Sequence, residues 1–396
     1  MEIKDSATNV TINNAGTIKG NGGGRHGIEI WGTSTVDNIT NTGTIDSGSG
    51  SGLSVTNNST LKNLENSGTI KGIKVDNGGK LGILNNTGDI NNINVSNGSK
   101  INSINNQGGT GNISVTNGTI DNINNIGTIS NISLFSNSTS NKTNIKNFTN
   151  NGVVSTLSLS TGHWSAGQNT IETIINNNII NKIEIKTSST IENLSNNGTI
   201  FSNTDGIYMV EENNFIPTIS TLNNTNLIGG NSNGINISEG GTIKNLHNKG
   251  TIIGKNNDGI SFTYYNTGNP YKSKMELLDN NEGVIIGAQN GINLSDKGNS
   301  VTLEIGTIIN KGSIIGQKGN GLYIGNKNSQ QIKDYIKLDG SNALIAGGTA
   351  GIYNKGTIGV NNNGKSVNNG NVIDLQNGAT IAALTFSEDG NSYTYN

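Results

Sequence analysis

Two aspartates stand at equivalent positions of a repeated motif and could act as an acid–base pair. Asp205 and Asp258 each immediately precede the glycine of a Gly-[Ile/Leu]-x-apolar segment, and the copy between them has Asn233 there. If the copies stack as turns of a solenoid, two turns separate the carboxylates by roughly 10 Å. Inverting glycosidases use nearly this separation between the acid that protonates the leaving oxygen and the base that activates water. Asp205 and Asp258 are therefore the candidate catalytic residues of a glycoside hydrolase or lyase.

The same two positions also have an explanation without catalysis, because Asp and Asn both suit tight turns. Asn290 and Asn320 precede the glycine in later copies. The sequence places no Arg or Lys cluster and no third carboxylate beside the pair. We therefore expect a protein that is not an enzyme, and the carbohydrate-active enzyme is the alternative hypothesis.

A tyrosine-rich segment is the first candidate for binding. Tyr264, Tyr265 and Tyr271 lie close together in the sequence, followed by Lys272 and Lys274. Tyrosine is amphipathic and loses little conformational entropy when it is ordered, so it suits contacts with glycans or proteins. The alternative is that these side chains only cover one edge of the fold.

The pair His163-Trp164 is the second binding candidate, in an insertion between repeats. A histidine beside a tryptophan is more often a surface feature than a ligand or a base. His26 and His247 occupy different repeat positions and form no metal-ligand pair. No Gly-Gly-x-Gly-x-Asp calcium repeat occurs. We expect no metal and no cofactor.

The elements that position these residues follow from an internal repeat. The unit Asn-x-Gly-x-Ile begins at Asn14, Asn41, Asn66, Asn86, Asn125, Asn196, Asn248, Asn281, Asn310 and Asn354. From Gly68 to Gly127 it returns about every 20 residues, the length of one coil of a β-solenoid.

The segment from Gly88 to Asn106 illustrates one coil. Its apolar residues lie two or three apart in short runs, as strands with one inward face require. Asn97-Gly98 separates the runs, and both residue types tolerate the left-handed conformation of tight corners. Asparagines at the same corner of successive coils can exchange amide hydrogen bonds along the axis. We predict an all-β fold, a right-handed parallel β-helix with about three short strands per coil and roughly sixteen coils.

Coil length varies along what we predict to be a single β-helix, residues 1–396. The Gly-[Ile/Leu]-x-apolar segment follows the first motif after a turn in the outer parts, but Gly72-Ile73-Lys74-Val75 follows almost at once. We expect broader coils in residues 1–67, slim coils of about 20 to 25 residues in 68–200, broader coils with side loops in 201–383, and a tail at 384–396.

Composition and charge exclude several partners. The net charge of −2 gives no basic field for phosphates, so nucleic-acid binding is not expected. No apolar run approaches the roughly 20 residues of a membrane span, and residues 1–5 do not resemble a signal peptide. The chain has no cysteine, which excludes disulfides and thiolate chemistry.

The Asn-Asn-x-Gly-Thr-Ile units, the Gly-Ile-x-Ile partner segments and the absence of cysteine resemble the passenger domains of bacterial autotransporters, the type V secreted proteins, over residues from about 9 to 383. That family carries a signal peptide before the passenger and a C-terminal β-barrel that anchors it in the outer membrane of Gram-negative bacteria. The resemblance implies an excised passenger fragment displayed at the cell surface, with adhesion, autoaggregation or toxin activity.

Three hypotheses for function remain at this point. The first is a virulence-associated adhesin that binds a host-cell surface protein or glycan, or a neighbouring cell through self-association. The second is the carbohydrate-active enzyme. The third is a passive spacer stalk that carries another functional region.

Overall fold

The computed structural model describes residues 1–137, 142–162, 167–211, 215–263, 272–295, 302–325, 330–359, 372–386 and 393–395. Within these ranges every regular element is a β-strand, and no helix is long and apolar enough to cross a membrane. The chain divides into two compact units, Met1–Ile180 and Asn181–Asn396.

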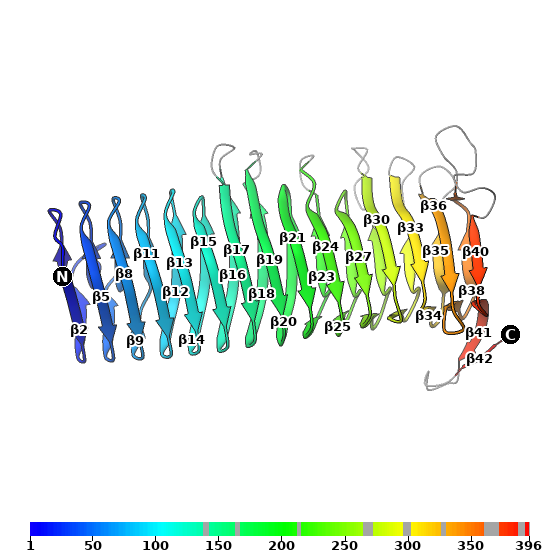
Figure 1. Ribbon diagram of the computed structural model, residues 1–396, viewed down its shortest axis with the longest axis horizontal. Coiled ribbons are helices and arrows are strands. Elements are labelled where there is room, and N and C mark those ends of the chain that lie inside the picture. Colours follow the sequence, from blue (N-terminus) through cyan, green and yellow to red (C-terminus); the bar gives the residue numbers. More distant parts are fainter. Residues whose placement is uncertain are drawn as a thin grey trace. The chain divides into compact units, whose positions relative to one another are not determined.

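The first unit contains two series of parallel strands, and strands of one series lie side by side in successive coils (Figure 1). The first series is β1 (Glu2–Ile3), β3 (Thr17–Gly20), β4 (Ile28–Ile30), β6 (Thr44–Ser47), β7 (Leu53–Val55), β9 (Thr69–Ile70), β10 (Ile73–Val75), β12 (Asp89–Ser96), β14 (Gly109–Thr116), β16 (Thr128–Ser136) and β18 (Val153–Thr161). The second series is β2 (Val10–Asn14), β5 (Thr35–Asn41), β8 (Thr60–Asn66), β11 (Lys80–Asn86), β13 (Lys100–Asn106), β15 (Thr119–Asn125), β17 (Lys142–Asn150) and β19 (Gln168–Asn176).

The second unit repeats this arrangement. Its first series is β20 (Ile179–Lys186), β22 (Thr199–Ser202), β23 (Ile207–Val210), β25 (Leu227–Gly230), β26 (Ile235–Ser238), β28 (Thr251–Gly254), β29 (Ile260–Thr263), β31 (Val284–Gly287), β32 (Ile292–Leu294), β34 (Ser313–Gly316), β35 (Asn320–Ile324), β37 (Leu344–Gly347), β38 (Ala350–Asn354), β41 (Thr380–Phe386) and β42 (Tyr393–Tyr395). Its second series is β21 (Ser189–Asn196), β24 (Thr218–Asn224), β27 (Thr242–Asn248), β30 (Lys272–Asn280), β33 (Thr302–Asn310), β36 (Gln330–Asp339), β39 (Thr357–Ile358) and β40 (Ile373–Gln376). Among the described residues these strands pair in parallel, except that β41 and β42 are antiparallel.

The core of each unit is a column of aliphatic side chains in register. Leu53, Ile73 and Ile93 are partners on three successive strands, and all three are fully buried. Burying one such side chain contributes roughly 1.5–3 kcal/mol, but a single short strand has no second layer against which to bury it. Stacking coil on coil supplies that layer, as in other solenoids. The prediction of an all-β parallel β-helix is confirmed.

Buried asparagines form a hydrogen-bonded ladder in each unit. In the first unit it consists of Asn14, Asn41, Asn66, Asn86, Asn106, Asn125, Asn150 and Asn176. In the second it consists of Asn196, Asn224, Asn248, Asn280 and Asn310. Each Nδ2 donates to the Oδ1 of the next asparagine over 2.7–2.9 Å. These ladders satisfy buried amides and lock the register between coils.

Two copies of the sequence motif do not align as the pattern suggests. Asn280 occupies the ladder position, not Asn281, because this corner has one more residue and Glu282 takes a positive φ of 69°. Asn354 lies outside the ladder, because it ends β38 and pairs with Ile324.

Candidate functional site

A pocket in the first unit lies where two loop-bearing coils meet coils without a loop. Residues 21–27 connect β3 to β4, and residues 48–52 connect β6 to β7. In the next coil only Lys71 and Gly72 separate β9 from β10, and β12 then runs without interruption through the equivalent positions. The loop of residues 48–52 therefore stands above the outer face of the following coils and forms a wall beside it.

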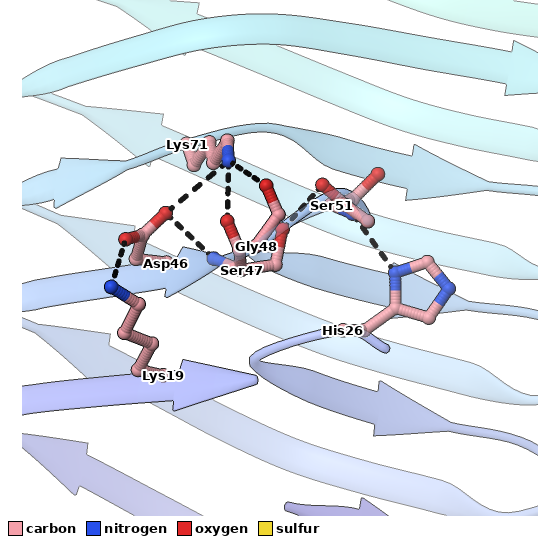
Figure 2. Close-up of polar contacts among 8 residues, drawn as sticks. Lys19, His26, Asp46, Ser47, Gly48, Ser51 and Lys71 are labelled. Atoms are coloured by element: carbon pink, nitrogen blue, oxygen red, sulfur yellow. Dashed lines mark hydrogen bonds and ion pairs between the residues drawn. The ribbon is translucent and has the colours of Figure 1, made fainter. Parts of the chain in front are cut away.

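Hydrogen bonds join the two loops. The amide of Gly24 donates to Ser49 Oγ over 2.7 Å. The amide of Ser51 donates to His26 Nδ1 over 3.0 Å, as Figure 2 shows. Because Nδ1 accepts this bond, the neutral imidazole carries its proton on Nε2. The ring orientation and the tautomer of His26 are thus set by the loop of the next coil.

Lys71 closes the base of the second loop (Figure 2). Its ammonium group donates to the carbonyl oxygens of Ser47 and Gly48, the latter over 2.8 Å, and lies 3.7 Å from an oxygen of Asp46. Lys19 lies 3.8 Å from the other oxygen of Asp46. A cationic side chain that bridges two carbonyls and a carboxylate holds the loop at a fixed height above the sheet.

The space beside these loops, which we call the His26 pocket, has a volume of about 460 Å³. Its lining side chains are His26, Lys71, Lys74, Asn92 and Asn94, completed by serines and glycines of the loops. None of the described residues that line it carries a carboxylate or an apolar side chain.

Two glycines of this pocket have close neighbours. A Cβ on Gly72 would lie 2.5 Å from Asn92 Oδ1, and a Cβ on Gly50 would lie 2.6 Å from the carbonyl oxygen of Arg25. The wall of the pocket therefore depends on glycine at position 50, whereas a side chain at position 72 would require the Asn92 side chain to move.

Lys74 stands on the floor of the His26 pocket beside a buried carboxylate. Its Nζ lies 2.9 Å from Asp76, which also accepts hydrogen bonds from Ser96 and Asn97, each over 2.8 Å. Burial raises the pKa of Asp76, but the hydrogen bonds from Lys74, Ser96 and Asn97 outweigh it and hold that pKa below its ordinary value. Asp76 fixes Lys74 from one side, and the ammonium group keeps further N–H groups for the pocket.

The candidate catalytic aspartates, in the second unit, are members of another ladder. Asp205 accepts hydrogen bonds from the backbone amide of Asn233 over 3.0 Å and from its Nδ2 over 2.8 Å. Asn290 makes the same two contacts with Asp258, each over 3.0 Å. Asn233 and Asn290 in turn accept from the backbone amides of Asp258 and Asn320. The column therefore joins each coil to the next through side chain and backbone.

The second carboxylate oxygen of each aspartate also accepts hydrogen bonds. Asn236 donates to Asp205 over 3.0 Å, while Ser261 and Asn293 donate to Asp258 over 3.1 and 2.7 Å. Asp258 is 5% exposed and lines an open pocket of about 330 Å³, whereas Asp205 does not line it. This pocket therefore does not bring the two carboxylates together.

The lysines of the predicted binding segment are engaged in ion pairs. Lys272 lies 2.8 Å from Glu304, and Lys274 lies 3.0 Å from Glu276. Glu304 is 1% exposed and also accepts a hydrogen bond from Gln331 over 2.7 Å. Burial raises the pKa of Glu304, but the contacts with Lys272, Gln331 and Lys274 together outweigh it and hold that pKa below its ordinary value. Lys272 therefore compensates a buried charge.

The remaining predicted binding residues lie outside the described residues. These are His163, Trp164, Tyr264, Tyr265 and Tyr271.

The His26 pocket was not predicted from the sequence. His26 and Lys74 are 48 positions apart and belong to different copies of the repeat. The available signal was the abrupt loss of the turn at Lys71-Gly72, which marks the step between coil types.

Among the described residues, no three histidine or carboxylate side chains lie close enough together to hold a metal ion. No protein-family model matches the chain, and no curated protein and no solved structure is significantly similar to it.

Proposed function

We propose that this protein is a non-enzymatic adhesin of a bacterial cell surface, which attaches to host or neighbouring cells through the sides of its β-helix. The observation that carries the proposal is the contrast between its polar groups. The carboxylates of Asp205 and Asp258 accept hydrogen bonds from neighbouring coils, whereas the His26 pocket keeps polar groups directed to the surface.

A β-helix is physically suited to this role. The asparagine ladders satisfy the buried corners of each unit, so the aliphatic core can be narrow while the outer faces stay free. Loops on such a scaffold can differ from coil to coil without disturbing the core, and binding residues are commonly found on such loops.

The test is attachment of the purified, fluorescently labelled protein to a panel of mammalian and bacterial cells. We expect saturable attachment that competes with unlabelled protein. Replacing residues 264–271 or 163–166 with Gly-Ser segments of equal length then tests which of these two segments contributes to attachment.

The variant Asp258→Asn is the matched control. If the protein is an adhesin, this variant attaches as the unmodified protein does. Absence of attachment to every cell type, or glycan cleavage that is abolished in Asp258→Asn, would contradict the proposal. Attachment that is unchanged by both replacements would place the contact elsewhere on the coils.

A further inference from the structure

We propose that the His26 pocket binds an acidic saccharide unit, recognised through its carboxylate or sulfate group. The inference names a ligand class for the proposed adhesion and rests on that function for its biological meaning. It concerns a site that none of the predicted binding residues forms.

Several polar groups of the His26 pocket keep an N–H or O–H that can donate to a ligand. His26 Nδ1 is occupied by the amide of Ser51, so Nε2–H is the group left to donate. Ser49 Oγ already accepts from Gly24, which leaves its hydroxyl proton. Asn92 Oδ1 accepts from Asn94 over 3.3 Å, which leaves its own Nδ2. Within the described residues these donors and the ammonium group of Lys74 have partners on one side only, so a ligand rich in acceptors fits them.

The charged side chains that line the pocket are cationic. No carboxylate lines the pocket, and its cations are Lys71 and Lys74. Their partners Asp46 and Asp76 lie outside the lining, and Lys19 shares Asp46 with Lys71. The two ammonium groups of Lys71 and Lys74 therefore line the pocket, while the carboxylates of Asp46 and Asp76 do not. A ligand with a negative group is favoured there, since charge-assisted hydrogen bonds are the stronger ones.

The composition and size of the pocket favour a saccharide over other anions. The lining consists of charged, amide, hydroxyl, imidazole and glycine groups, so it offers nothing to the apolar side chains of a peptide. A volume of about 460 Å³ is within the usual range of small-ligand sites and exceeds what an inorganic anion fills. A ring with hydroxyl groups on all sides and one acidic substituent matches these contacts.

Two other pockets lack this combination. The pocket on the other side of His26 contains Glu2 and Glu29, and the pocket beside Phe201 is lined by Leu227 and Ile253. The His26 pocket is also held rigid by the bonds between its loops, which lowers the entropic cost of binding.

The experiment is isothermal titration calorimetry of the full chain with three tetrasaccharides. One is a heparin tetrasaccharide, which carries sulfate and carboxylate, one is tetragalacturonic acid, which carries carboxylate only, and one is neutral cellotetraose. We expect binding of at least one acidic probe and none of cellotetraose. Binding of heparin alone would assign the site to sulfate, and binding of both would assign it to carboxylate as well.

Two variants test the position of the site. Lys74→Gln should weaken binding of the acidic probe at least tenfold, and Asn92→Asp should abolish it because the new carboxylate faces the ligand. Both side chains are partly exposed, so the fold should persist, and circular dichroism checks this. Lys62→Gln is the control. Lys62 lies on β8, outside the pocket, and its Nζ is 2.7 Å from Asp37. This variant should bind the acidic probe as the unmodified chain does.

The outcomes separate this inference from the proposed function. Failure of both acidic probes to bind, equal binding of cellotetraose, or equal binding by Asn92→Asp and the unmodified chain would overturn the inference. Cell attachment that persists in Asn92→Asp would leave the adhesin proposal intact and remove this pocket from it. Binding of the acidic probe without attachment to any cell type would support the ligand class of the pocket and contradict the adhesin proposal.

Discussion

Removing one rung of the asparagine ladder should destabilise the coils on either side of it. The substitution Asn106→Ala removes the buried Nδ2 group, which donates to Asn125 Oδ1 over 2.8 Å, to Thr128 O over 3.1 Å and to Gly108 O over 3.1 Å. The side-chain oxygen of Asn106 also accepts from Asn86 and from Thr110, each over 2.9 Å. One residue thus satisfies groups from several coils.

The magnitude follows from which groups lose every described partner. Asn86 Nδ2 keeps the carbonyls of Gly88 and Gly109, and Gly108 O keeps the amide of Thr128. Asn125 Oδ1 and the hydroxyl of Thr110 are left buried without their partner in Asn106. Each such group costs about 1–3 kcal/mol, so we expect a loss of about 2–6 kcal/mol.

The assay is native-state hydrogen exchange of peptides that cover residues 80–130, combined with urea unfolding. Because each coil contacts only its neighbours, protection should fall most in β11, β13 and β15. The control is Asn102→Ala in the same coil, where the side chain is exposed and a change below about 0.5 kcal/mol is expected. Equal effects of the two substitutions would refute the structural role assigned to the ladder.

Three further predictions concern the corners and the buried charges. In Gly108→Ala the new Cβ would lie 2.1 Å from Gly88 O, so we expect loss of soluble, folded protein on expression, measured by circular dichroism and size-exclusion chromatography; folding as in the unmodified chain would contradict the close approach. Asp258→Asn should keep the free energy of unfolding within about 1 kcal/mol, because the amide oxygen can accept from Asn290, and the new Nδ2 can donate to Ser261 Oγ and, once that amide turns over, to Asn293 Oδ1; a larger loss in urea unfolding would show that the charge itself is required. The folded pKa of Glu304 lies below its ordinary value of 4.5, so its contribution to stability is present above pH 4.5 and is lost as the pH falls through the folded pKa. In Glu304→Gln this part of the acid destabilisation should disappear from urea unfolding measured at several pH values, and an unchanged pH dependence would exclude the Lys272 pair as its source.

Much of the fold can be predicted from the sequence, because every coil repeats the same turn and the same inward-facing apolar side chain. The Asn-x-Gly-x-Ile unit shows where the chain turns and which side chain enters the core, and a strand of that length must stack to bury it. The exchange of amide hydrogen bonds between corner asparagines is also predictable, since identical residues at a fixed period meet in the stack. The misplacement of Asn281 and Asn354 arose where a corner gains a residue or the repeat breaks down, which a motif alone does not register.

Only the tertiary structure decided the environment of each polar side chain. The sequence allowed Asp205 and Asp258 to be either acids or turn residues, and their environment became visible only when the amides of the next coil were placed against them. Lys272 could be a surface contact until the buried Glu304 was found beside it. The His26 pocket exists because coils of different width follow one another, so that residues from separate repeats share one wall and one floor. Period and residue type therefore determined the coil, and the register between unequal coils determined the candidate site.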